Sequence, residues 1–304
     1  MKLCTFSPLP SGEPRPGLVL DDRRIVDIPA ALGASADTAT MLGLIGAGAP
    51  MLQRLRELEA RSPVDTPTIA DVRLHAPIPR PAKNVFCVGW NYLEHFEEGG
   101  RTLKDDRELP KHPVLFTKAP TTVTGPYDAI PFHAHLSTQL DWEAELGLVV
   151  GTAGRDIAEG DAMRHVFGYT VVNDLSWRDI QRRHGGQWHK GKSLDGSCPI
   201  GPWIVTADAL DPSDLAIACR VNGVVKQASR TRFLYFKLPR ILAELSAGMT
   251  LEPGDIVSTG TPQGVGYART PPEFLVPGDL LETEVEGIGV MRNTIAEAAR
   301  RIAG

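Results

Sequence analysis

Hydrophobic residues gather in short runs that end at glycine, proline or polar residues, and few stretches show helical spacing. Strands and helices do not alternate regularly, which argues against a doubly wound α/β fold. The pattern therefore predicts an α+β, β-rich protein. We expect strands at 2–7, 16–20, 24–28, 84–90, 114–118, 140–150, 166–174, 203–206, 216–221, 224–229, 256–259 and 280–285, and helices at 51–60, from 91 onward, and at 175–183, 238–247 and 294–302.

A proline-rich stretch between residues 61 and 81 indicates a boundary or an extended connector. We therefore divide the chain into a small N-terminal α+β domain, residues 1–75, and a larger domain, residues 76–304. The N-terminal residues show no pattern of catalytic or metal-binding side chains. We expect a structural role for them, or a contribution to dimerisation.

Composition narrows the range of functions. The 304 residues are 42% hydrophobic and 23% charged with a net charge of −5, so neither a nucleic acid nor a membrane surface is an expected partner. Basic and aromatic residues do interleave between residues 182 and 192, but no wider basic patch supports nucleic-acid binding. The four cysteines form no C-x-x-C motif, and the first residues lack the apolar core of a signal peptide. We expect a cytoplasmic protein with reduced thiols.

Glu143 and Glu145 are the first candidate ligands. In a strand over 140–150 they point to one face, with carboxylates roughly 6–7 Å apart. The apolar residues that follow indicate that this strand enters the interior, where paired acids require a cation or protons. A solvated sheet edge is the alternative.

Asp174 ends the second buried-looking run, at an expected strand-to-helix junction. Such an aspartate is either a ligand or a local turn or helix cap. Three carboxylates without a cysteine or histidine cluster suit Mg²⁺ or Mn²⁺ better than Zn²⁺. Octahedral Mg²⁺ would leave open positions for water and a chelating substrate.

His95 and Glu98 lie three residues apart in the helix expected from Asn91, which we assign as its cap. A carboxylate beside an imidazole fixes its tautomer and raises its basicity, as a general base requires. An ordinary surface pair is the alternative. The charged segment 99–112 that follows is either a lid or a plain solvated loop.

Six segments in order carry a family resemblance: GWNYLEHFEE (89–98), LFTKAPTTVTGP (115–126), LDWEAELGLVVG (140–151), VFGYTVVNDLSWRDIQ (166–181), GKSLDGSCPIGPWIVT (191–206) and LEPGDIVSTGTPQGVG (251–266). Together they resemble the fumarylacetoacetate hydrolase family over about residues 80–295. The resemblance implies a mixed-sheet β-roll and a homodimer. It also implies Glu143, Glu145 and Asp174 as metal ligands.

The resemblance assigns further roles, each with a structural alternative. His95 and Glu98 match the water-activating dyad, and Lys192 matches a lysine that stabilises negative charge near the metal. Arg178, Gln181 and Thr261 match substrate-contacting positions; the alternatives are an exposed helix face for the first two and a tight turn for Thr261.

The implied function is Mg²⁺-dependent (or Mn²⁺-dependent) hydrolysis of a C–C bond in a 2,4-dioxo acid of the acylpyruvate or fumarylpyruvate type. His95 would deprotonate water, and Mg²⁺ with Lys192 would stabilise the pyruvate enolate. A 2-hydroxymuconate-type isomerase or an oxaloacetate decarboxylase on the same site is the alternative, followed by a sugar-acid dehydratase and a metal-binding scaffold without turnover. Trp90 is expected to narrow the pocket beside the dyad.

Overall fold

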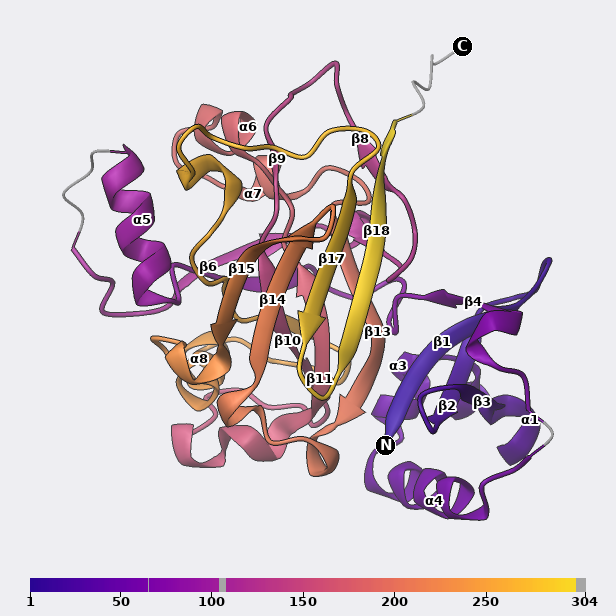
Figure 1. The fold of residues 1–304 in the computed structure, drawn as a ribbon. Helices are drawn as coiled ribbons and strands as arrows, with labels where there is room; N and C mark the ends of the chain where they lie inside the picture. Colours follow the sequence, from indigo (N-terminus) through magenta and orange to yellow (C-terminus); the bar gives the residue numbers. More distant parts are fainter. Residues whose placement is uncertain (65, 104–107, 299–304) are drawn as a thin grey trace, which may run out of the picture.

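The computed structural model describes residues 1–64, 66–103 and 108–298 (Figure 1). Its strands are β1 Lys2–Pro8, β2 Arg15–Leu20, β3 Arg24–Asp27, β4 Val72–His75, β5 Val85–Gly89, β6 Val114–Lys118, β7 Val123–Thr124, β8 Ile130–Phe132, β9 Leu140–Asp141, β10 Ala144–Val150, β11 Val166–Asn173, β12 Ser176–Trp177, β13 Cys198–Thr206, β14 Ala216–Val221, β15 Val224–Arg230, β16 Ile256–Ser258, β17 Leu280–Val285 and β18 Gly289–Glu297. Its α-helices are α1 Ile28–Leu32, α2 Ala36–Ala39, α3 Met41–Gly46, α4 Gly48–Arg61, α5 Leu93–Leu103, α6 Arg178–Arg183, α7 His189–Lys192 and α8 Leu238–Ser246.

Two mixed sheets organise these elements. An 11-stranded sheet runs β3-β2-β1-β13-β11-β10-β16-β5-β6, with β4 and β7 paired to its side, and a 5-stranded sheet runs β15-β14-β17-β18-β8. Most pairs are antiparallel, while β16–β5, β13–β7 and β18–β8 are parallel. The predicted α+β, strand-rich fold is therefore confirmed.

The central strands β10 and β11 are buried along their whole length. On β10, Leu146 and Leu148 join the hydrophobic core that includes residues of the smaller sheet, while Val149 faces a second core shared with the N-terminal helices. This burial on both faces explains why the sequence of β10 is apolar at successive positions. Polar side chains at the ends of these strands are consequently held away from bulk water.

The N-terminal elements β1–β4 and α1–α4 group together on one side of the molecule (Figure 1, lower right). Strand β1 hydrogen-bonds to β13 as well as to β2, so the N-terminal strands extend the large sheet. Helix α4 matches the expected helix, while α1, α2 and α3 are short and have no clear periodicity in the sequence. The division at residue 75 stays a proposal.

Several local predictions are correct. Asn222-Gly223 joins β14 and β15, with φ of 51° and 76°, the left-handed values that a two-residue hairpin requires. Helix α8 ends just before Gly248, which has a φ of 70°.

Other local predictions are wrong. Helix α5 begins at Leu93, and the buried Asn91 amide instead donates to the carbonyls of Phe236 and Thr259. The expected loop 99–112 is helical as far as residue 103, and its residues 104–107 lie outside the described part of the chain.

Two predicted helices also differ. Residues 175–183 contain the short strand β12 before α6, because Ser176 and Trp177 pair with β9. The C-terminal helix expected at 294–302 is wrong for residues 294–297, which continue β18 beside β17 and β8. Within the described residues, no helix is long and apolar enough to span a membrane.

Candidate active site

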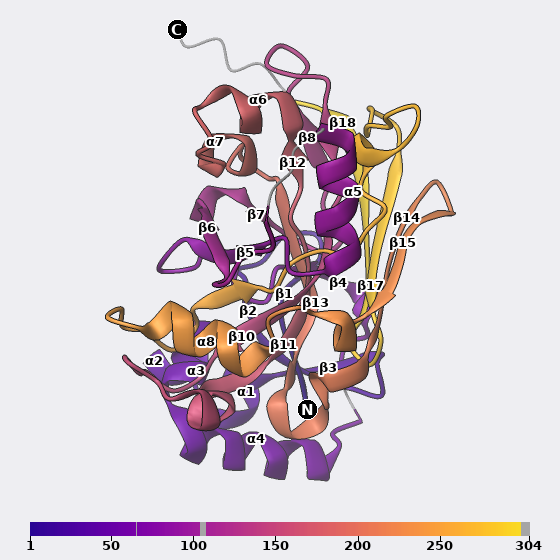
Figure 2. The same cartoon turned by 90° about the vertical axis from the view of Figure 1, so that its left-hand side faces the viewer.

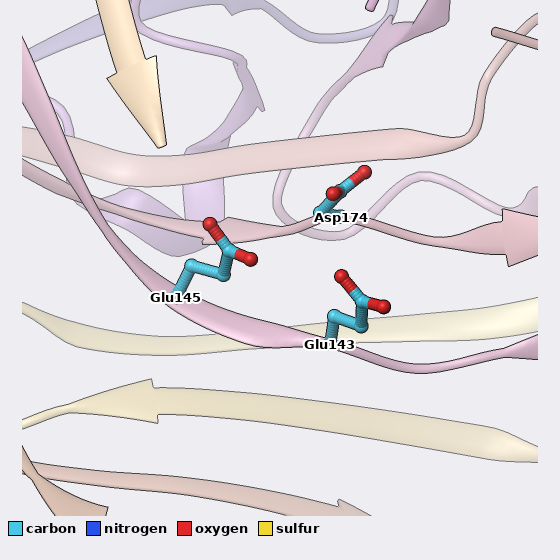
Figure 3. A group of neighbouring side chains, drawn as sticks. All are labelled: Glu143, Glu145 and Asp174. Carbon is cyan, nitrogen blue, oxygen red and sulfur yellow. The ribbon is translucent and has the colours of Figure 1, made fainter. Parts of the chain in front are cut away.

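Glu143, Glu145 and Asp174 converge at one end of β10 and β11. Each offers a carboxylate oxygen within 4.8 Å of the others, and all three side chains are buried (Figure 3). Figure 3 shows Glu143 and Glu145 on one segment of the chain, pointing toward Asp174, which lies just after the end of β11 on the neighbouring segment. The sequence prediction that three separated acids share one sheltered place is therefore correct in its geometry.

Backbone pairing explains this convergence. The strand expected over 140–150 is interrupted between β9 and β10, and Glu143 lies in the break. The Glu143 amide donates to the Asn173 side chain at 2.9 Å, and the Asp174 amide donates to the Glu143 carbonyl at 2.9 Å. These two bonds continue the β10–β11 pairing and hold Asp174 beside Glu143.

Two hydrogen-bond donors hold the Glu145 carboxylate in place. Its Oε2 accepts hydrogen bonds from the Ser258 hydroxyl at 2.6 Å and from the Gly260 amide at 2.8 Å. Burial raises the pKa of Glu145 well above its ordinary value, and the nearby carboxylates of Asp174 and Glu143 raise it further. Glu145 is therefore the acid of the three that most readily keeps a proton when no metal is bound.

Two buried lysines neutralise the other acids. Lys192 Nζ lies 2.7 Å from Glu143 Oε2 and 2.6 Å from Asp174 Oδ2. Lys118 Nζ donates to the Leu175 carbonyl at 3.0 Å and makes an ion pair with Asp174 Oδ1 at 2.9 Å. The Lys192 ammonium thus contacts two of the three candidate metal ligands, and an incoming ion must displace it from them.

The electrostatics agree with these contacts. Burial opposes the charged forms, but the neighbouring cations Lys192 and Arg178 outweigh it and hold the pKa of Glu143 well below its usual range. Burial likewise opposes the charged form of Lys192, and Asp174 and Glu143 reverse that effect and raise the pKa of the ammonium. Both partners are therefore ionised at neutral pH.

Arg178 extends the network through a fourth acid, Asp141. Its Nε donates to Asp141 Oδ2 at 2.7 Å, and its Nη2 lies 2.7 Å from Glu143 Oε1. Asp141 also accepts the backbone amides of Gly266 at 2.6 Å and Tyr267 at 3.1 Å. Asp141 therefore anchors Arg178 and the 266–267 turn to the same point.

The innermost charges can be counted. The four buried acids Asp141, Glu143, Glu145 and Asp174 face three buried cations: Lys118, Arg178 and Lys192. With Glu145 protonated the cluster is neutral, which is the arrangement that burial favours. A divalent ion that displaces the proton would leave one excess positive charge, which suits an anionic ligand.

His95 and Glu98 form the expected pair. His95 Nδ1 lies 2.8 Å from Glu98 Oε1, and Glu98 also accepts the Gly264 amide, at 2.9 Å to Oε2. The imidazole is nearly buried and lines the same pocket as Glu143 and Glu145. The surface-pair alternative is therefore wrong, and the Glu98 contact leaves Nε2 of the ring for proton transfer.

The pocket between these groups has a volume of about 250 Å³. Trp90 and Trp188 form part of its wall, with ring centroids 4.9 Å apart, and Phe116 packs against Trp188 at 5.2 Å. Trp90 adopts a φ of 53°, so the chain turns sharply there before α5. Trp90 therefore lines the pocket on the side of the dyad, and its narrowing effect stays a prediction.

The remaining predicted residues also line the pocket. Gln181 Oε1 accepts a hydrogen bond from Arg178 Nη1 at 3.2 Å. The Thr261 hydroxyl donates to the Ala144 carbonyl at 3.0 Å and accepts from Gln227 at 2.8 Å. Sequence reasoning assigned no role to Lys118, although the resemblance places it near the substrate region, and it did not indicate Asp141, Arg182, Trp188 and Tyr267, of which the last three line the pocket. Asp141 had a visible signal, since it continues the alternation of acids at 143 and 145.

A fold of two mixed sheets with a buried acidic triad and an adjoining His–Glu pair is that of a metal-dependent enzyme of the fumarylacetoacetate hydrolase type. The family description "Fumarylacetoacetate (FAA) hydrolase C-terminal" matches residues 84–296, and the chain belongs to this family. The chain is 41% identical to oxaloacetate tautomerase YisK of Bacillus subtilis over 291 residues, which cover 92% of this chain and 95% of that protein.

Solved structures agree on the fold. The fumarylacetoacetate hydrolase of Exiguobacterium antarcticum superposes with a TM-score of 0.82 at 40% identity, covering 98% of this chain and 99% of that one. The maleylpyruvate hydrolase of Sphingobium sp. SYK-6, solved in complex with manganese(II) ion and pyruvate, has a TM-score of 0.78 at 31% identity, covering 98% and 100%. The relatives named are enzymes, and this chain is an enzyme of their family.

The triad fits a divalent metal. Its donors are all carboxylate oxygens, the ligand type that Mg²⁺ and Mn²⁺ prefer, and their spacing lets one ion reach all three. No cysteine or histidine takes part in this cluster, so a zinc site is not indicated.

Proposed function

We propose that this enzyme acts on small 2-oxo acids with Mg²⁺ or Mn²⁺, and that its main reaction is the keto–enol interconversion of oxaloacetate. The observation that carries the proposal is the small pocket that His95, held by Glu98, shares with Glu143 and Glu145 of the acidic triad. The similarity to oxaloacetate tautomerase YisK over nearly the whole chain supports this substrate over a larger one.

Glu143, Glu145 and Asp174 would hold the divalent ion, which would supply Lewis-acid polarisation of the substrate's 2-oxo group. Lys192, once displaced from Glu143 and Asp174, would hold its ammonium beside the negative charge that develops at the C2 oxygen. Gln181 and Thr261 would orient the carboxylate end.

His95 would move the proton. In the enol-to-keto direction the imidazolium would donate a proton to C3, and the enol oxygen would release its proton to water, from which the neutral imidazole would regain one. The composition of the substrate and the protonation of His95 are therefore unchanged at the end of the cycle. Glu98 keeps Nδ1 engaged, which directs Nε2 to the substrate and stabilises the imidazolium form. The aromatic wall of Trp90 and Trp188 would limit the access of water to C3.

The test is the loss of enol-oxaloacetate's ultraviolet absorbance, measured with Mg²⁺, with Mn²⁺ and with chelator, against the uncatalysed blank. We expect acceleration that requires the metal and falls about 10²- to 10⁴-fold in His95→Asn. A rate equal to the blank with either ion would overturn the proposal.

Hydrolysis of an acylpyruvate is the second candidate. The specific observation in its favour is the same dyad, because an imidazole fixed by a carboxylate can also deprotonate water for attack on C4. Cleavage of the C3–C4 bond would then give pyruvate and a carboxylic acid. Release of pyruvate from acetylpyruvate, with no effect on enol-oxaloacetate, would favour this candidate. The homodimer that the family resemblance implies also remains a proposal.

A further inference from the structure

Arg182 stands at the mouth of the pocket without a carboxylate partner among the residues that the structure describes. It follows Arg178 by one helical turn on α6, and both guanidinium groups lie over the Tyr267 ring, at 4.5 Å for Arg178 and 5.2 Å for Arg182. Its surroundings differ from those of Arg178, which is buried against Asp141 and Glu143.

Within the described part of the chain, Arg183 differs from Arg182 in having a carboxylate partner. Arg183, next in sequence, lies 3.4 Å from Asp179 in an exposed ion pair and does not line the pocket. Partial burial and the positive charge of Arg178 both lower the pKa of Arg182, which means that its surroundings disfavour the cation. An anion bound beside it would relieve that cost. Tyr267 limits the directions in which the guanidinium can point.

The net charge of the buried cluster also favours a carboxylate bound beside Arg182. A divalent ion with the deprotonated triad would leave one excess positive charge in the buried cluster, which one substrate carboxylate balances. A second carboxylate on the substrate would bring an unbalanced negative charge into the pocket. Of the cations that line the pocket, Arg178 and Lys192 are already paired, and Arg182 is the one left for it.

From this arrangement we propose that Arg182 binds the distal carboxylate of a 2-oxo dicarboxylic acid and thereby selects diacids over monoacids. The inference rests on the proposed function, because it assumes that the 2-oxo acid end of the substrate occupies the metal site. A guanidinium suits this task because it can bind a carboxylate through two parallel hydrogen bonds. Arg182 then determines specificity and takes no part in proton transfer.

The experiment compares two ligands of equal carbon number that differ only at the far end. 2-Oxoglutarate carries a second carboxylate where 2-oxopentanoate carries a methyl group. Their binding to the Mg²⁺-loaded enzyme is measured by calorimetry for wild type, Arg182→Gln and Arg183→Gln. We expect wild type and Arg183→Gln to prefer 2-oxoglutarate by about 10- to 100-fold, the range for a charge-assisted hydrogen bond.

In Arg182→Gln that preference should disappear while the affinity for 2-oxopentanoate is unchanged. Arg182→Lys should recover part of the preference for 2-oxoglutarate, because lysine keeps the positive charge but lacks the planar guanidinium group. If Arg182→Gln keeps the wild-type preference, or wild type has none, the inference is wrong and the proposed function stands. If neither acid binds to any of the Mg²⁺-loaded proteins, the proposed function fails and the inference fails with it.

Kinetics provide a second readout. On oxaloacetate, Arg182→Gln should raise KM with little change in kcat, because an interaction with the unreacting end of the substrate is the same in ground and transition states. A fall in kcat at unchanged KM would contradict a binding role for this residue. The Arg182 side chain is exposed overall, although its guanidinium is partly desolvated beside Arg178 and Tyr267, so the variant should fold, and its melting temperature checks this.

Discussion

The ammonium of Lys192 lies 2.6 Å from Oδ2 of Asp174, at the centre of the group of acids that the metal would occupy. The same lysine reaches Glu143 at 2.7 Å. One ammonium group thus compensates the charge of two carboxylates. A metal ion that binds Glu143 and Asp174 would therefore take the place of the Lys192 ammonium beside them.

Replacement of Lys192 by methionine should destabilise the metal-free protein more than the metal-loaded one. Without the ammonium, buried carboxylates lose their partner, a change that costs about 3–5 kcal/mol at buried ion pairs. Bound Mg²⁺ would supply the missing charge. The rise in melting temperature on adding Mg²⁺ should therefore be larger in Lys192→Met than in wild type. Lys190→Met, on the exposed side of α7, is the control, and an equal rise in all three proteins would contradict this account.

Glu145 should lose a proton when the metal binds. Its pKa is raised in the metal-free protein, so it is neutral at pH values where an ordinary glutamate is ionised. Metal affinity should accordingly increase with pH above the ordinary glutamate pKa of about 4.3, while the stability of the metal-free protein should decrease over the same interval. Calorimetry of Mg²⁺ binding in buffers of different ionisation enthalpy measures the released proton.

Glu145→Gln provides the comparison. The variant should bind Mg²⁺ more weakly and release no proton from this position. Proton release equal to that of wild type would show that another group titrates.

The His95–Glu98 pair should affect turnover and leave metal binding intact. Neither residue contacts the triad through a hydrogen bond within the described chain, and both belong to α5. Glu98→Gln should reduce kcat on enol-oxaloacetate about 10- to 10³-fold, because an amide stabilises the imidazolium less well than a carboxylate. Titration with Mn²⁺ should give the wild-type affinity. A parallel loss of Mn²⁺ affinity would place the pair in the metal site instead.

Asp141 should contribute to stability more than an exposed aspartate does. Its fully buried carboxylate accepts from Arg178 and from the backbone amides of Trp142, Gly266 and Tyr267. Asp141→Asn therefore removes one of the two carboxylates that pair with the buried Arg178 guanidinium. Loss of one partner of such a pair costs about 3–5 kcal/mol. Urea unfolding measures this cost, and Asp161→Asn, which breaks the exposed pair with Arg164, should cost less than about 1 kcal/mol. Equal effects of the two substitutions would be inconsistent with the buried network.

The sequence was sufficient to bring the three candidate metal ligands together because each acid follows or interrupts an apolar run that must be buried. Glu143, Glu145 and Asp174 share that property, and the sheet pairs β10 with β11 as their alternation requires. The His95–Glu98 contact also follows from local helical spacing. These features depend on residues close together in the chain or on one pair of adjacent strands.

The parts that escaped prediction depend on contacts between distant segments. Lys118 ends the exposed-looking strand β6, and only the approach of Leu175 and Asp174 shows that its ammonium is buried. Asn91 resembles a helix cap in sequence, but its side-chain amide donates hydrogen bonds to the carbonyls of Phe236 and Thr259, which are far away along the chain. Local propensity cannot anticipate a partner that is brought close by the tertiary fold.

The three cations among the buried acids have a practical consequence for handling the protein. Because Lys118, Arg178 and Lys192 would compensate the buried acids after removal of the metal, chelation should switch the enzyme off without unfolding it. The stripped protein could then be stored and reloaded with one chosen ion after another. Activity with each metal would be compared in a single preparation.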